Sequence, residues 1–157
     1  MSDPYLLLKS IHILGVIIFL GNIIVTGWWK FMADRTRDAA IIAFAQRQVT
    51  LTDFVFTTGG IVLILIGGMG NVILFAMDAW HTLWLLWGYS LFVVSGLIWG
   101  IILLPIQIKQ ARMTQAFAHD GVIPDNYWQL TRQWNIFGTI ATVLPAINIY
   151  WMVFKTT

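Results

Sequence analysis

The chain has 157 residues, of which 59% are hydrophobic and 10% charged, and its mean hydropathy is +0.78. This composition is typical of an integral membrane protein and excludes an ordinary soluble domain. The formal net charge of +2 is too small and too scattered for a nucleic-acid surface, and the lack of cysteine excludes disulfides, thiolate metal sites and iron–sulfur ligation. We expect residues 1–157 to form a single domain in contact with the lipid bilayer.

Four apolar stretches follow one another along the chain, each long enough to cross a ~30 Å hydrocarbon layer, which needs roughly 20 helical residues. Because backbone polar groups inside a bilayer must bond to one another, the predicted fold class is all-α, a four-helix transmembrane bundle. We expect the helices at about 4–28, 51–77, 80–108 and 127–154. The first lacks a basic n-region and is too long for a signal sequence, so we interpret it as a retained transmembrane helix.

The links between these stretches differ in charge. Residues 29–50 and 109–126 contain most of the basic side chains, whereas the link at 77–79 contains none. By the positive-inside rule the two basic links are cytoplasmic, so we expect both termini on the outer, periplasmic side of a bacterial inner membrane. Within 29–50, Asp38 can cap a short amphipathic helix, which we expect to lie on the inner membrane surface.

Small residues predict how the helices pack. Gly96 and Gly100 form a GxxxG motif in the third stretch, and the second stretch contains five glycines. Such residues permit close approach of neighbouring helices. We favour packing within the bundle, with a homodimer seam as the alternative.

Polar side chains at similar depth predict an outer layer shared by the helices. Lys9 and His12 lie three residues apart and therefore on one face of the first helix. At a rise of about 1.5 Å per residue, His12 lies roughly 12 Å below the start of its helix. Met69 and Asn148 lie at a similar depth, whereas His81 is nearer the interface.

An ionisable side chain near the centre of a transmembrane helix costs roughly 2.5–3.5 kcal/mol and therefore indicates a functional site. Imidazole and thioether both ligate haem iron, so His12 with His81 or Met69 predicts an axial pair for haem b. Lys9 can then neutralise a haem propionate. In the structural alternative, His12 donates to Asn148 or to a backbone carbonyl and fixes helix register.

One geometric difficulty attends the pair of histidines. His81 lies about 8–10 Å shallower than His12 on these boundaries, whereas two ligands of one iron should be level. Either the third helix begins earlier than residue 80, or His81 belongs to the interface.

A second, inner layer contains Asn22 and charged residues close to helix ends. We expect Asp53 to pair with Arg132, or alternatively with Arg47. Charges near lipid headgroups usually pair structurally or extend towards water, so we assign this layer no chemistry.

The stretch YLLLKSIHILGVIIFLGN, residues 5–22, resembles the first helix of HemJ-type protoporphyrinogen oxidases and of CopD-like four-helix membrane proteins. The resemblance covers Lys9 and His12, and Trp80 with His81 is similar to that family's tryptophan–histidine start of the third helix. It implies an external N-terminus, haem b and electron transfer to or from the membrane, with a membrane electron carrier or quinone as partner.

Two features depart from that resemblance. After Gly21 the chain reads NIIVTGWWK where the HemJ-type family has a proline–arginine–aromatic stretch, and residues 83–85 lack a lysine soon after the histidine. The segments GNIIVTGWWK, AFAQRQVTLTDFVFTTGG and SGLIWGIILLPIQ more closely resemble an uncharacterised bacterial family of predicted integral membrane proteins. That second resemblance spans nearly the whole chain and implies no activity.

Three functions therefore remain open. The first is a haem-binding redox protein, and on this reading the chain is a candidate haem-dependent oxidoreductase. The second is a small transporter or channel without a cofactor, in which the outer and inner polar layers are two halves of one path. The third is an accessory structural subunit of a larger membrane complex.

Overall fold

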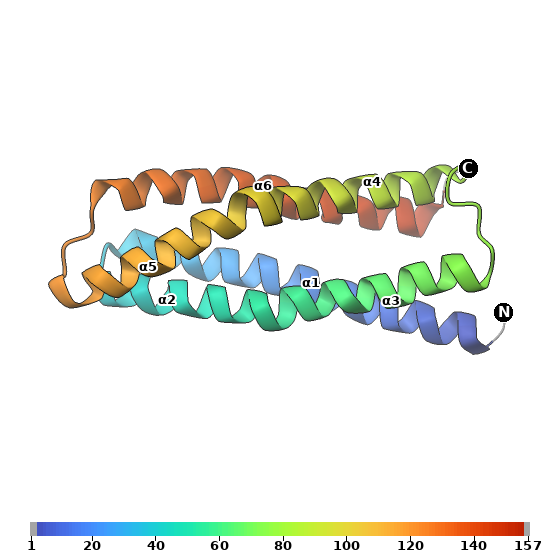
Figure 1. Ribbon diagram of the computed structural model, residues 1–157, viewed down its shortest axis with the longest axis horizontal. Coiled ribbons are helices and arrows are strands. Elements are labelled where there is room, and N and C mark those ends of the chain that lie inside the picture. The colour runs from blue at the N-terminus through green and yellow to red at the C-terminus, as the bar shows by residue number, and fades with distance from the viewer. Residues whose placement is uncertain (1–2, 156–157) are drawn as a thin grey trace.

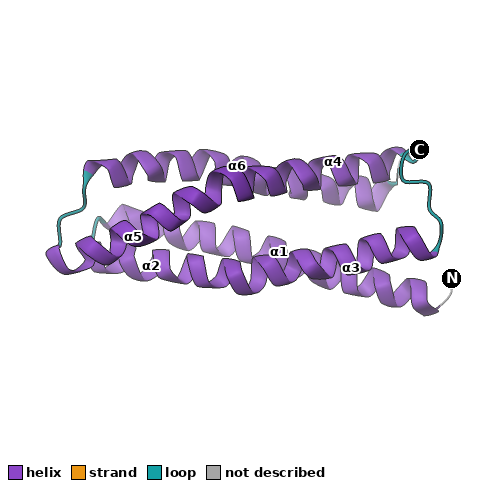
Figure 2. Ribbon diagram, in the orientation of Figure 1, coloured by secondary structure: helices purple, strands orange, loops and turns teal. Residues whose placement is uncertain are grey.

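The computed structural model describes residues 3–155, with the backbone but not the side chains of residues 119 and 120. Four long helical rods lie side by side, and the described residues form helices and short links only (Figures 1 and 2). The predicted all-α four-helix bundle is confirmed. The elements are α1 (Asp3–Thr36), α2 (Ala39–Thr52), the π-helical η1 (Asp53–Thr57), α3 (Thr58–Leu74), α4 (Leu83–Leu97), the π-helical η2 (Ile98–Leu103), α5 (Leu104–Asp120) and α6 (Asp125–Phe154).

Each rod is long and apolar enough to cross a membrane. The candidate membrane spans contain 34, 36, 36 and 30 residues, because α2 continues through η1 into α3, and α4 continues through η2 into α5, where the third span is counted to Ala118. At about 1.5 Å per residue even the shortest rod reaches roughly 45 Å, which exceeds the hydrocarbon layer. Large apolar side chains such as Ile17, Ile73 and Ile101 are exposed on the outer surface of the bundle, as contact with lipid requires.

The prediction of two long basic links, at 29–50 and 109–126, is wrong, because helices cover most of both segments. α1 ends at Thr36, and α2 begins at Ala39, where the Asp38 carboxylate accepts hydrogen bonds from the backbone N–H groups of Ala40 and Ile41. The predicted cap is therefore confirmed. The helix that it starts is not a short surface helix, since α2 packs against α1 and α5 and continues into α3.

Two ends of the bundle can be distinguished in Figure 1. The basic end contains the turn at residues 37–38 and the link at 121–124, while the terminal end contains both chain termini and the link at 75–82. We call the half with α2, α5 and the adjoining parts of α1 and α6 the basic half. The half with α3, α4 and the remaining parts of α1 and α6 is the terminal half.

Glycines bring α1 and α3 into close contact in the terminal half. A Cβ atom on Gly15 would lie 2.7 Å from the backbone nitrogen of Ile64, and one on Gly60 would lie 2.8 Å from the Cβ atom of Phe19. Gly60, Gly67, Gly68 and Gly70 of the second stretch therefore do permit close helix approach, as predicted, whereas a Cβ atom on Gly59 would meet nothing within 4 Å among the described residues.

The GxxxG motif behaves differently from these glycines. A Cβ atom on Gly96 or Gly100 would meet nothing within 4 Å among the residues that the structure describes. The prediction that this motif packs within the bundle is therefore wrong. The homodimer seam, its alternative, stays a prediction.

Candidate functional site

His12 lies at the contact between α1 and α3. Its Nδ1 atom is 2.9 Å from the carbonyl oxygen of Ile64. A carbonyl can only accept, so Nδ1 carries the proton and donates. A Cβ atom on Gly68 would lie 2.9 Å from Nδ1, so the lack of a side chain there makes room for the ring.

His81 lies outside the helices, because α4 begins at Leu83 and not near residue 80. Its Nδ1 atom is 2.8 Å from Asp78 Oδ2, and its side chain is 86% exposed. Asp78 also accepts from the backbone N–H groups of Trp80 and His81. The backbone N–H of His81 and then its ring hold the pKa of the Asp78 carboxyl below its usual value.

The other predicted site residues lie apart from these two. Lys9 is exposed, Met69 is 48% exposed, and Asn148 donates from Nδ2 to the carbonyl oxygen of Gly88 at 3.0 Å. No hydrogen bond joins any two of the five predicted residues in the described part of the chain. Nor do three or more histidine or acidic side chains of the described residues come together as a metal site.

Asp53 is held in the interior by three neutral donors. Asn22 Nδ2 and Thr57 Oγ1 donate to its Oδ1 atom at 3.0 and 2.9 Å, and Gln107 Nε2 donates to Oδ2 at 3.0 Å. These groups come from α1, η1 and α5, so Asp53 ties three rods together.

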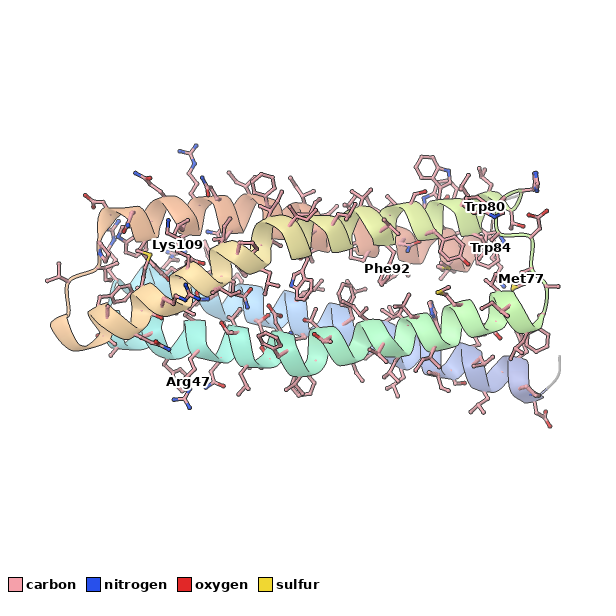
Figure 3. The ribbon with its side chains drawn as sticks, in the orientation of Figure 1. Arg47, Met77, Trp80, Trp84, Phe92 and Lys109 are labelled. Atoms are coloured by element: carbon pink, nitrogen blue, oxygen red, sulfur yellow. The ribbon has the colours of Figure 1, made fainter. Side chains whose placement is uncertain are left out.

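The predicted pairing of Asp53 with Arg132 or Arg47 is wrong. Both arginine side chains are exposed, and Figure 3 shows Arg47 projecting away from the other helices. A guanidinium group retains its hydration at the helix surface, whereas the amides and hydroxyls that bind Asp53 lose less on burial.

A cavity of about 730 Å³ adjoins Asp53. Its walls come from α1, η1, α3, α4, η2, α5 and α6, and its lining includes the exposed side chains of Ile24 on α1 and Val143 on α6, at 54% and 46%. Both π-helical segments contribute to the wall, η1 with Asp53 and η2 with Trp99. Such segments often occur at functional sites, since the extra residue redirects side chains.

The cavity wall is mostly aromatic and aliphatic. Asp53 is the only ionisable residue among the described residues that line it. Trp99 and Trp134 also line it, and their Nε1 atoms are buried without an acceptor among the described residues. An indole N–H can only donate, so both groups await an acceptor oxygen. The aromatic lining residues are Phe19, Trp28, Phe31, Phe92, Trp99 and Trp134.

A buried ionic cluster lies between the cavity and the basic end. Lys30, which is 1% exposed, donates from Nζ to Asp34 Oδ2 at 2.9 Å and to the Tyr127 hydroxyl at 3.1 Å. That hydroxyl donates to Asp34 Oδ1 at 2.9 Å. The ammonium group also lies 5.5 Å from the ring centroid of Trp134, a wall residue of the cavity. The cluster and the cavity therefore share a neighbour.

Two further buried amides lie on the rods that hold Asp53 and Gln107, about two turns before Asp53 and about one turn after Gln107. Gln46 and Gln110 are 1% and 0% exposed. Gln110 Nε2 donates to Thr131 Oγ1 at 2.9 Å, but Gln110 Oε1 and both side-chain polar atoms of Gln46 have no partner in the described structure. An unpartnered buried polar group costs about 1–3 kcal/mol, so ordered water or another ligand is the usual explanation.

Four apolar helices that enclose a polar core define an integral membrane protein of the multi-pass class. The chain matches the model of the predicted integral membrane protein family DUF2269 over residues 6–156, and it belongs to that family. No curated protein and no solved structure matches it. The family description names no activity, so the site itself must carry the functional argument.

Proposed function

We propose that this protein is a small membrane carrier that takes a lipophilic organic cation from the bilayer into the cavity and holds it against Asp53. The observation that carries the proposal is the solitary position of Asp53 on an otherwise uncharged, aromatic-rich wall. An ionisable group within a membrane span is costly and marks a substrate or ion path by default.

The hydrogen bonds of Asp53 favour this ligand class. A carboxylate has about four lone-pair sites, and three neutral donors use three of them. Neutral donors leave the net charge in place, and the basic residue Lys30 is already paired with Asp34. A proton or a ligand cation at the remaining site would therefore neutralise Asp53.

The aromatic wall supports the same ligand class. A cation over an aromatic face gains about 0.5–1 kcal/mol at exposed sites and about 2 kcal/mol when desolvated. An apolar body attached to the cation would fill the rest of the cavity. The two unpartnered indole N–H groups of Trp99 and Trp134 suit amines that also carry an acceptor oxygen.

Binding of tetraphenylphosphonium to purified protein tests this proposal. We expect saturable binding by equilibrium dialysis, weakened about tenfold or more in Asp53→Asn, because the counter-charge is lost. Asp78→Asn is the matched control, since it removes an exposed carboxylate outside the cavity. Equal affinity of the Asp53→Asn variant and the unaltered protein would refute the proposal, as would equally tight binding of uncharged triphenylphosphine oxide.

Haem b bound at His12 is the second candidate function. The hydrogen bond from Nδ1 to the Ile64 carbonyl supports it, because metal-ligating histidines commonly donate their other ring N–H to such an acceptor. Nε2 of His12 then remains available. The proposed second ligand is His81 or Met69, Lys9 is the proposed partner of a propionate, and Asn148 is a further proposed cofactor-binding residue. A bound haem would supply one-electron redox chemistry, with a membrane electron carrier or quinone as partner.

The absorption spectrum of protein produced with full haem supply tests the second candidate. A Soret band that shifts on dithionite reduction and is absent in His12→Ala would support it. Colourless, folded protein would refute it and leave the cation site unaffected, because His12 does not line the cavity.

We also propose that the basic end faces the cytoplasm of a bacterial inner membrane, following the positive-inside rule. The chain has no cysteine, so single-cysteine variants report topology without background. Arg37→Cys should react with a membrane-impermeant maleimide only after the cells are opened, whereas Ala79→Cys should react in intact spheroplasts. The reverse pattern would overturn the orientation.

A further inference from the structure

Buried polar side chains recur on all four rods between the basic end and the cavity, and we call this set the polar column. It runs from the basic end to the cavity, and each rod contributes residues at helical spacing along one face. On α1, Thr26, Lys30 and Asp34 recur every four residues. Its members are Thr26, Lys30, Asp34, Gln46, Asp53, Thr57, Gln107, Gln110, Thr114, Tyr127 and Thr131.

From this column we propose that Asp53 exchanges a proton for the bound cation, and that the proton travels through the polar column between Asp53 and the basic end. The inference rests on the proposed cation site and adds the coupling ion and its route. In the empty cavity the open lone-pair site of Asp53 holds a proton. A monocation M⁺ then gives AspH + M⁺ → Asp⁻·M⁺ + H⁺, which conserves charge and atoms.

The basic-end segment of the column is already connected. The Tyr127 hydroxyl donates to Asp34 and accepts from Lys30, so one hydroxyl bridges a carboxylate and an ammonium group. Asp34 lies two residues before the end of α1, and Tyr127 lies two residues after the start of α6. The cluster is therefore close to the aqueous boundary at that end.

The middle of the column has buried polar atoms without a partner among the described residues. These are the amide oxygen and nitrogen of Gln46 and the amide oxygen of Gln110. Buried water typically makes about three hydrogen bonds to such groups. Water held by these amides would connect the Lys30 cluster to Gln107, which donates to Asp53.

The cavity end of the column contains a single proton-accepting group. Among the described side chains, none of the cations on the elements packed against Asp53 faces it. The sequence of α3 has no ionisable residue, and the exposed cations of the other rods are Arg47 of α2, Lys109 and Arg112 of α5, and Arg132 of α6. On α1 the nearest charged pair is Lys30 with Asp34. Lys30 lies eight residues, about two turns, after Asn22, the α1 residue that donates to Asp53. Proton and cation therefore compete for one carboxylate.

Stopped-flow mixing of the purified, weakly buffered protein with tetraphenylphosphonium and a pH indicator tests the exchange. We expect about one proton released per cation bound, because one lone-pair site is contested. Release should be absent in Asp53→Asn. Absence of cation binding would refute the cation site and the exchange with it. Binding without proton release would refute the exchange alone. Proton release at an unaltered rate in Gln46→Leu would refute the route.

Gln46→Leu tests the route. This change removes two unpartnered buried atoms, so the fold should tolerate it. We expect proton release to slow about tenfold or more, with unchanged cation affinity and proton stoichiometry. Gln133→Leu, the same substitution at an exposed position of α6, is the matched control and should leave the rate unchanged. Equal rates for both variants would overturn the route.

Discussion

The helices of the two halves of the bundle pack against one another in different ways. In the terminal half, α1 and α3 approach through Gly15 and Gly60, and a small apolar cluster of Phe19, Leu20 and Ile64 fills the contact. In the basic half, the rods hold buried charges and amides between them. Because lipid provides no hydrophobic driving force for helix association, close van der Waals packing stabilises the terminal half. Ionisable groups buried in a membrane span are costly, so those of the basic half indicate a function.

The largest expected effect comes from breaking the ionic cluster of the basic half. Lys30→Met leaves Asp34 buried without its cation, and removal of one partner of a buried pair costs about 3–5 kcal/mol. The free energy of unfolding in mixed micelles measures this loss. Lys30→Met combined with Asp34→Leu should recover most of the stability, since an apolar pair leaves no uncompensated charge. A stable single variant would show that the cluster contributes no such stabilisation.

Close packing in the terminal half gives the next largest effect. Gly60→Ala places a methyl group 2.8 Å from the Cβ atom of Phe19, so α1 and α3 must shift, at a cost of about 1–3 kcal/mol. Its neighbour Gly59 is the control, because a Cβ atom there meets nothing within 4 Å among the described residues. Thermal unfolding of the two alanine variants should differ accordingly. Equal midpoints would contradict the close contact.

A smaller loss is expected from the hydrogen bond of His12. His12→Leu removes the donor to the Ile64 carbonyl, and membrane hydrogen bonds between helices average about 0.6 kcal/mol, with a maximum near 1.7 kcal/mol. Unfolding in mixed micelles again provides the measurement. A loss well above that range would indicate a further partner of the imidazole.

The smallest effect concerns the link at the terminal end. The pKa of Asp78 is lowered in the folded protein, so its stabilisation is present above the unfolded-state pKa and is lost as the pH falls below about 4. Thermal midpoints of the unaltered protein and Asp78→Asn should therefore converge in acid. If the difference between the two thermal midpoints stayed the same at low pH, ionised Asp78 would not be the source of the stabilisation.

The sequence predicts the helices of the terminal half better than those of the basic half. Apolar length alone locates the four spans, and Asp38 signals the start of α2. Lys30 and Asp34 resemble loop residues because they are charged, yet each satisfies the other one turn along α1. Their spacing of four was the available signal, and it continues from Asn22 and Thr26.

Two partners of Asp53 could not be predicted, because they come from two other rods, 31 and 54 residues away in sequence. Charge alone favours an arginine, whereas the bundle places Asn22 and Gln107 beside the carboxylate. His12 shows the opposite case. Its depth is readable from the chain, but the Ile64 carbonyl depends on the register that Gly67 and Gly68 permit.

Infrared difference spectroscopy can observe the exchange of proton for cation at Asp53 itself. We expect tetraphenylphosphonium to remove a protonated-carboxyl C=O band from the unaltered protein, and we expect this change to be missing in Asp53→Asn. Retention of the band in protein saturated with the cation, or the same loss in Asp53→Asn, would contradict the exchange of proton for cation at this residue.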